Sequence, residues 1–108
     1  MLKCYIIGAV TGLDREIVEA KFKATAQVLK SAGFIPVVPI ELVPEESDWH
    51  SAMDTCIRAL LDSEAYVVQD DIATSKGALL EKAIAVNLDK IKVNLHEGRF
   101  LNAINPRR

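Results

Sequence analysis

Short β-favouring apolar runs alternate along this chain with longer segments of helical periodicity, and this alternation limits the possible folds more than any other feature. The apolar runs are residues 4–7, 34–38, 65–68 and 91–95, and the helical segments are residues 14–32, 48–63 and 75–88. Strands that alternate with helices form parallel sheets joined by right-handed crossovers. The sequence therefore predicts an α/β fold, a flavodoxin-like or Rossmann-like doubly wound parallel sheet of four to five strands with helices on both faces.

Polar residues and a glycine mark the ends of the predicted helices. Asp14, Asp48 and Ser75 stand at the helix starts, where their side chains can accept hydrogen bonds from free backbone amides. Gly33 follows the first helix and suits the left-handed conformation that ends many helices. Pro36 cannot donate a hydrogen bond within a sheet, so the strand that contains it is expected at a sheet edge.

Composition and charge restrict the partners and the cellular setting. The chain has 13 basic and 15 acidic residues and a net charge of -2, so it has no global positive field to hold a nucleic acid polymer. One domain is expected over residues 1–96, followed by a C-terminal tail at 97–108 whose last four residues fray. No signal-peptide pattern or membrane-length segment is visible, so a cytoplasmic protein without a membrane partner is expected. Cys4 and Cys56 lie in apolar stretches and are expected to be reduced core residues.

The predicted topology gathers several loops at one edge of the sheet. Parallel α/β sheets bind ligands at the carboxyl ends of their strands, where loops are expected here at residues 8–12, 39–47 and 69–75. Ser75 and Gly77 open a helix at this edge, where free amides and the positive helix end favour an anion. Gly77 would let a phosphate approach the backbone and Ser75 would offer a hydroxyl, although the same residues also describe an ordinary capped helix.

Glu81 is the candidate for chemistry at this edge. It lies four residues after Gly77 on the same helical face, about one turn from the expected anion position. The positive helix end would help to keep its carboxylate ionised, and an ionised carboxylate beside a sugar phosphate can attack an anomeric carbon. The spacing leaves one alternative open, a solvated helical glutamate that pairs with a lysine.

Several motifs occur in an order that resembles a known superfamily. They are Tyr5-Ile6-Ile7-Gly8-Ala9-Val10-Thr11-Gly12, the helix end at Ala32-Gly33-Phe34, Trp49 before a helix, and Ser75-Lys76-Gly77-Ala78-Leu79-Leu80-Glu81. Together they resemble the domain-of-unknown-function branch of the nucleoside 2-deoxyribosyltransferase-like superfamily, which is related to the deoxynucleoside 5′-monophosphate N-glycosidases. The resemblance covers residues 3–95.

The resemblance implies a doubly wound sheet, usually a homodimer or larger oligomer, that cleaves or exchanges the N-glycosidic bond of a deoxynucleoside or its monophosphate. The family's nucleophile maps onto Glu81, which would hold the sugar as an ester until water or a second base releases it with retained configuration. Ser75, Gly77 and the loop from Gly8 to Gly12 correspond to the 5′-phosphate site of the monophosphate-cleaving relatives. No metal or organic cofactor is required.

Aromatic residues and histidines allow further interpretations. Under the resemblance Tyr5 would lie near the sugar or base; the alternative is a buried strand tyrosine with a core partner. Trp49 could stack on a base, and His50 could donate to a phosphate or to the leaving base, but packing of Trp49 under the long loop explains it equally well. His50 and His96 lack metal-ligand partners at a useful spacing, so no zinc site is expected.

The sequence departs from the family pattern at Cys56, onto which an aspartate of the active relatives maps. Cysteine cannot replace that carboxylate, and Asp54 would project to a different side of the helix. Asp70 or Asp71 could supply the missing acid from the ligand edge, unless both are merely solvated. The departure leaves a second function open, a catalytically weak module that binds or senses a nucleotide.

Overall fold

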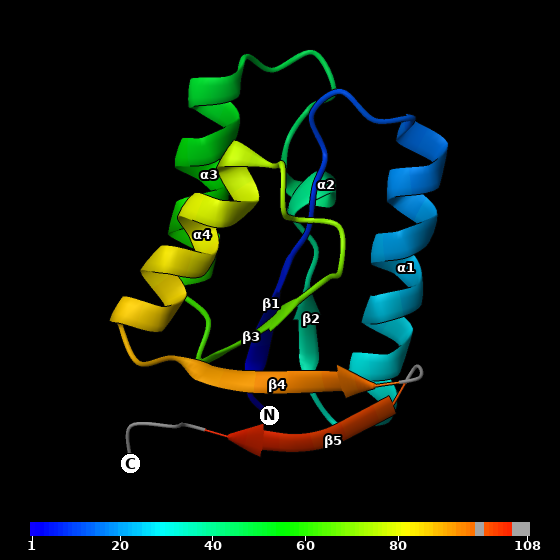
Figure 1. Cartoon of the computed structure of the whole chain (residues 1–108), viewed down its shortest axis with the longest axis vertical. Coiled ribbons are helices and arrows are strands. Elements are labelled where there is room, and N and C mark those ends of the chain that lie inside the picture. Colours follow the sequence, from blue (N-terminus) through cyan, green and yellow to red (C-terminus); the bar gives the residue numbers. More distant parts are fainter. Residues whose placement is uncertain (97–98, 105–108) are drawn as a thin grey trace.

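The computed structural model describes residues 1–96 and 99–104, with side chains up to residue 94. The strands are β1 (Lys3–Ile7), β2 (Ile35–Val37), β3 (Ala65–Val68), β4 (Ile91–His96) and β5 (Arg99–Ile104). The helices are α1 (Arg15–Ser31), α2 (Pro39–Leu42), α3 (Trp49–Leu61) and α4 (Lys76–Asn87). Figure 1 shows α1 on one side of the central sheet and α3 with α4 on the other.

The strand order explains how the chain winds. The sheet has the order β2-β1-β3-β4-β5, and its neighbours from β2 to β4 pair in parallel. This order arises when right-handed crossovers lead first to one side of β1 and then to the other. β5 returns antiparallel to β4 and forms the far edge. The predicted flavodoxin-like, doubly wound α/β fold is thus confirmed.

The residues predicted to mark the starts of three helices and the end of the first are found at those positions. Asp14, Asp48 and Ser75 each accept a hydrogen bond from a backbone amide in the first turn of α1, α3 and α4, over 2.9, 2.8 and 3.3 Å. Gly33 has a φ of +90° and follows α1, as a left-handed helix end requires. Local sequence chemistry therefore sets where these helices begin and where α1 ends.

The two edges of the sheet differ in how far the sequence predicts them. Pro36 is the middle residue of β2, and the predicted edge position of this strand is confirmed. β5 lies within the segment that the sequence predicts as a tail, so residues 99–104 are part of the sheet, which corrects that expectation. The predicted fraying of residues 105–108 falls outside the described residues.

A short helix, α2, replaces part of the predicted loop at 39–47. Pro39 occupies its first turn, where the missing backbone N–H leaves no hydrogen bond unmade and the fixed φ suits a helix. Its amphipathic pattern is too short to show periodicity. α2 follows directly on the carboxyl end of β2, so it lies at the carboxyl edge of the sheet, where it contacts α3.

Side chains that alternate along β1 enter two separate cores, one on each face of the sheet. Cys4 and Ile6 belong to an aliphatic cluster under α1 that includes Phe22. Tyr5 and Ile7 belong to a second cluster under α3 and α4. The remaining buried members of this second cluster are Cys56, Leu60, Tyr66, Ile72, Ala78 and Ala85.

Both cysteines are buried and free, as the sequence predicts. Burial raises the pKa of the Cys4 thiol to about 12. The two side chains lie on opposite faces of the sheet, in the two different cores. Within the described residues, no helix is both long and apolar enough to cross a membrane.

Candidate functional site

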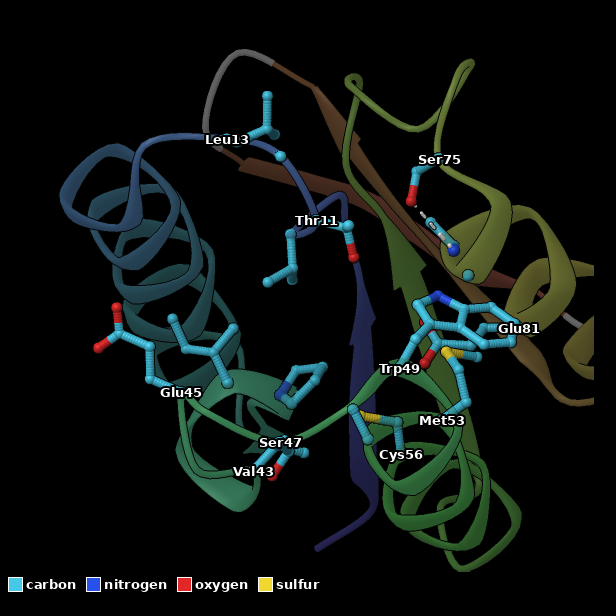
Figure 2. A pocket seen from close by; sticks show the side chains of 18 of the residues that line it. Thr11, Leu13, Val43, Glu45, Ser47, Trp49, Met53, Cys56, Ser75 and Glu81 are labelled. Atoms are coloured by element: carbon cyan, nitrogen blue, oxygen red, sulfur yellow. Dashed lines mark hydrogen bonds between the residues drawn. The ribbon is translucent and has the colours of Figure 1, made fainter.

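A pocket of about 340 Å³ opens at the carboxyl ends of β1 and β3. It is enclosed by the loop after β1, the segment 39–47 and the starts of α3 and α4 (Figure 2). Its volume lies near the lower end of the range for small-molecule sites. Most of the predicted site residues line it, namely Gly8, Gly12, Trp49, Ser75, Gly77 and Glu81.

Glu81 belongs to the wall that α4 contributes to this pocket, and it is only 5% exposed. It shares the buried face of α4 with Ala78 and Ala85, whose small side chains let the helix approach the sheet closely. The buried Tyr5 hydroxyl on β1 donates a hydrogen bond to Glu81 Oε2 at 2.7 Å. The interpretation of Glu81 as a solvated glutamate is therefore wrong, and Tyr5 is a buried strand tyrosine with Glu81 as its partner.

The charge state of Glu81 also differs from the expectation. Burial raises the pKa of its carboxyl to about 7, against the opposing effect of the hydrogen bond from Tyr5. Withdrawing a carboxylate from water raises its pKa more than a helix end one turn away lowers it. Near neutral pH Glu81 is therefore present in both forms, which is a useful property for proton exchange in an active site.

Cys56 lines the same pocket from α3. Burial raises the pKa of its thiol to about 11, so it stays protonated near neutral pH. Its pKa also responds to Tyr5 and to Glu81, so these three side chains form one buried cluster. The position onto which the relatives' aspartate maps thus faces the pocket beside Glu81, but it carries a weak acid.

The start of α4 packs tightly against the start of α3. A Cβ added to Gly77 would lie 2.9 Å from Met53 Sδ and 3.7 Å from Trp49 Nε1. The Lys76 ammonium covers the Trp49 indole, 4.7 Å from the ring centroid. Figure 2 shows Trp49 and Met53 beside Glu81, with Ser75 nearby. The glycine at position 77 thus avoids a close contact with the Met53 side chain, and Trp49 lies beside it at the start of α3.

Gly8 and Gly12 frame the first loop for different reasons. Gly12 has a φ of +80°, a backbone conformation that residues with a side chain rarely adopt. A Cβ on Gly8 would collide with the Gln69 side chain and approach Phe22 Cζ to 3.0 Å. The loop between them lines the pocket with Val10 and Thr11.

Asp70 and Asp71 do not line the pocket. Asp71 accepts hydrogen bonds from the Ala9 amide at 3.3 Å and from Lys21 Nζ at 2.9 Å. The Asp70 side chain is 93% exposed and reaches the same lysine only at 3.5 Å. Asp71 thus ties the loop after β3 to α1, whereas Asp70 is largely in solvent, and the position of neither favours it as the missing acid.

No group of His, Cys, Asp or Glu side chains that could hold a metal ion occurs within the part of the chain that the structure describes. The His50 ring packs edge to face on Trp49, with 5.3 Å between the ring centroids, and His50 does not line the pocket. The side chain of His96 lies outside the described residues.

The wall of the pocket opposite Glu81 was not predicted from the sequence. Figure 2 shows Val43 and Glu45 across the pocket from Glu81 and Trp49. Arg15, at the start of α1, also lines the pocket and donates from Nη2 to the carbonyl of Ile40 in α2. No motif marks these residues, and the only signal was their position in or beside loops at the ligand edge.

Comparison with known proteins places the chain in a family. No curated protein matches it at a significant level. A family model described as a domain of unknown function, DUF4406, matches residues 2–94. The match runs from β1 into β4 and includes every residue of the predicted site. This chain belongs to the DUF4406 family.

Proposed function

We propose that this chain cleaves or exchanges the N-glycosidic bond of a deoxynucleoside or a deoxynucleoside monophosphate, as the nucleoside 2-deoxyribosyltransferase-like superfamily does. The observation that carries the proposal is the carboxyl of Glu81, which is buried and yet lines a pocket of small-molecule size. Tyr5 holds one of its oxygens, and within the described residues no hydrogen bond is made to the other. That second oxygen is the proposed nucleophile.

The proposed reaction has two displacements at the anomeric carbon. Ionised Glu81 forms an ester with this carbon while the carbon–nitrogen bond breaks and its electron pair leaves with the base. Water then attacks the same carbon and displaces Glu81, so the configuration is retained. The water supplies a hydroxyl to the sugar and a proton to the departed base, whereas a second base in its place gives exchange.

In this proposal the 5′-phosphate of a monophosphate lies between the first loop and the start of α4, as in the relatives. Ser75 and Gly77 line the pocket there, and the positive end of a 12-residue helix favours an anion. Lys76 adds a positive charge to a first turn that contains no acidic residue. Trp49 stands beside this position and is suited to stacking on the sugar or base.

The decisive experiment replaces Glu81 and measures base release. We expect Glu81→Gln to lower the release of free base from a panel of deoxynucleosides and their monophosphates by several orders of magnitude. Wild-type activity should rise as the pH passes through about 7, because the nucleophile must be ionised. Glu46→Gln, an exposed glutamate outside the pocket, is the matched control. Unchanged turnover in Glu81→Gln would reject the proposal.

A catalytically weak nucleotide-binding module is the second candidate, and the position of Cys56 favours it. The carboxylates that line the pocket within the described residues are Glu45 and Glu81, and the latter is already assigned as nucleophile. Asp70 and Asp71 are held on the α1 side. A poor leaving group would then limit the first displacement.

Substitution of Cys56 separates the two candidates. If an acid is missing, Cys56→Asp should raise base release by about 10²–10⁴-fold without a large change in nucleotide affinity. Cys56→Asn serves as the control, because asparagine has nearly the same shape as aspartate but carries no charge. A folded Cys56→Asp protein no faster than Cys56→Asn would favour the binding module. Melting temperatures measured in parallel identify a variant that fails because the new carboxyl is buried beside Glu81.

Assembly and location are proposed chiefly on the resemblance. A cytoplasmic homodimer or larger oligomer with a small-molecule ligand, without a nucleic acid polymer or membrane partner, fits the composition and the superfamily. Apolar side chains exposed on α4, Leu79, Leu80 and Val86, are available for contact between copies. Light scattering over a concentration series should give a mass above 11.9 kDa, the mass of one chain.

A further inference from the structure

Arg15 is a pocket-lining cation to which no function has yet been given. Its side chain is 30% exposed, and Nε donates to Glu19 Oε2 at 3.2 Å. Nη2 donates to the carbonyl oxygen of Ile40 at 3.3 Å. These two contacts fix the guanidinium plane between α1 and α2, while its remaining N–H groups have no acceptor within the described residues.

The surroundings of Arg15 suit a flat heterocycle with a polar edge. Val10, Leu13, Ile40, Val43 and Pro44 also line the pocket, so much of its wall is apolar. Figure 2 shows Val43 and Glu45 on the far side of the pocket from Glu81. Because Arg15 donates to Ile40 in α2, just before Val43, it belongs to this far wall. Arg15 thus ties α1 to α2 and, like Glu45, brings a charged group into a largely apolar wall opposite the proposed nucleophile.

The stereochemistry of the proposed reaction gives this wall a role. A nucleophile and a leaving group occupy opposite sides of the carbon at which one displaces the other. With Glu81 on the α4 side, the base therefore departs toward the wall of α1 and α2. We propose that Arg15 binds the nucleobase and stabilises it as it leaves, an inference that rests on the proposed function.

The guanidinium acts by hydrogen bonds and charge, without giving up its own proton. As the carbon–nitrogen bond breaks, the electron pair moves onto the base, and Arg15 hydrogen-bonds the acceptor atoms on which negative charge accumulates. The base anion then takes a proton from the water that releases the sugar from Glu81. Arg15 thereby performs the leaving-group role for which Cys56 is too weak an acid.

The shape of the donor selects the class of base. A guanidinium pairs best with two neighbouring acceptors, such as the oxygen at position 6 and the nitrogen at position 7 of a 6-oxopurine. Adenine presents an amino donor in place of that oxygen and pairs poorly. The substrates are therefore 6-oxopurine deoxynucleosides or their monophosphates, with hypoxanthine or guanine as the base.

Base release from deoxyinosine and deoxyadenosine tests this inference. We expect wild type to prefer deoxyinosine. Arg15→Gln should lower kcat/KM for deoxyinosine by about tenfold to a hundredfold and leave kcat/KM for deoxyadenosine nearly unchanged. Arg58→Gln is the matched control, because Arg58 pairs with Asp54 at the same helical spacing but does not line the pocket. Equal losses for both substrates, or no loss for either, would overturn the role of Arg15.

Binding of free bases keeps the test independent of turnover. Trp49 is the only tryptophan in the sequence and lines the pocket, so its fluorescence reports binding directly. If wild type releases no base at all, the proposed function fails. Titration with free hypoxanthine and adenine still tests whether Arg15 binds a base. Tighter binding of hypoxanthine than adenine, lost in Arg15→Gln, supports the base site, whereas equal binding of the two bases in wild type overturns it. Should Arg15→Gln unfold, Arg15→Lys keeps the charge without the paired donors and gives the same comparison.

Discussion

The two faces of the sheet bury different chemistry, although helices cover both. Under α1 the buried residues are almost all apolar, and the polar exceptions, Thr25 and Gln69, are neutral and hydrogen-bonded to each other at 3.1 Å. Under α3 and α4 the corresponding layer holds Tyr5, Cys56 and Glu81 in one cluster. Of the two layers, the one under α3 and α4 contributes buried ionisable side chains to the pocket, namely Cys56 and Glu81.

The difference shows where this fold gives up stability for reactivity. A carboxyl held in the core with its pKa near 7 opposes folding whenever it is ionised, whereas an aliphatic layer stabilises the fold at every pH. The α1 face is therefore the stable half, and the α3–α4 face is the half adapted to a ligand. The following predictions test this contrast, from the largest expected change in the free energy of unfolding to the smallest.

Phe22→Ala tests the α1 face. Phe22 is 1% exposed and packs in the aliphatic cluster, so its truncation leaves a cavity and should lower the free energy of unfolding by about 3–5 kcal/mol. Urea unfolding at pH 7 measures the loss. A loss below about 1 kcal/mol would mean that this layer is not the stable half of the molecule.

Glu81→Gln tests the other face and should change stability in the opposite direction. The ordinary pKa of 4.5 applies in the unfolded chain and about 7 in the folded protein, so folding binds a proton between these values. The contribution of Glu81 to stability therefore falls as the pH rises from 4.5 to 7, by about 3 kcal/mol in all.

The experiment is a pair of denaturant unfolding series from pH 4 to pH 8. The variant should become more stable relative to wild type across this range, because glutamine has no charge to bury. Subtracting the two curves removes the effect of every other titrating group that the substitution leaves unchanged. Parallel curves would show that Glu81 keeps an ordinary pKa.

Tyr5→Phe should have a smaller effect and a more specific signature. It removes the hydrogen bond that opposes the rise in the pKa of Glu81, so that pKa should increase above about 7. The free energy of unfolding at pH 8 should fall by about 1–2 kcal/mol. Tyr66→Phe is the matched control, since Tyr66 faces Tyr5 in register on β3. A carboxyl carbon NMR titration reads the pKa, and equal shifts in both variants would contradict the role of Tyr5.

Gly77→Ala should change stability least, by less than about 1 kcal/mol. The added methyl improves helix propensity but crowds Met53 Sδ, which lies 2.9 Å from the ideal Cβ position. A flexible methionine can move aside, so the two effects nearly offset. Thermal unfolding measures the net change, and a loss of several kcal/mol would show that the contact between α3 and α4 is rigid.

The fold was predictable because its signals are local. Asp14, Asp48 and Ser75 cap their helices as expected, and Pro36 gives β2 its place at the edge. The sequence did not reveal α2, which is too short for periodicity, or β5. β5 depends on antiparallel pairing with β4, a tertiary contact that a short segment does not encode by itself.

The site was predictable only in part, because loops have no period. Glu81, Ser75 and Gly77 follow from their positions on a helix that begins at the carboxyl edge. The sequence left the burial of Glu81 open, because its partners on the buried face of α4, Ala78 and Ala85, are too small to mark that face clearly. Nothing local indicated that Asp71 would turn toward Lys21 or that Arg15 would reach the pocket.

The proline in β2 also affects whether a further strand can add to this edge of the sheet. The Ile35 amide donates inward to the Leu2 carbonyl at 2.9 Å, so the next nitrogen along the strand, that of Pro36, faces outward. That nitrogen carries no hydrogen, and the outer margin of this short strand therefore offers an incoming peptide no N–H donor at its centre. Backbone pairing with an incoming strand is therefore disfavoured along β2, and β5 forms the other edge of the described sheet.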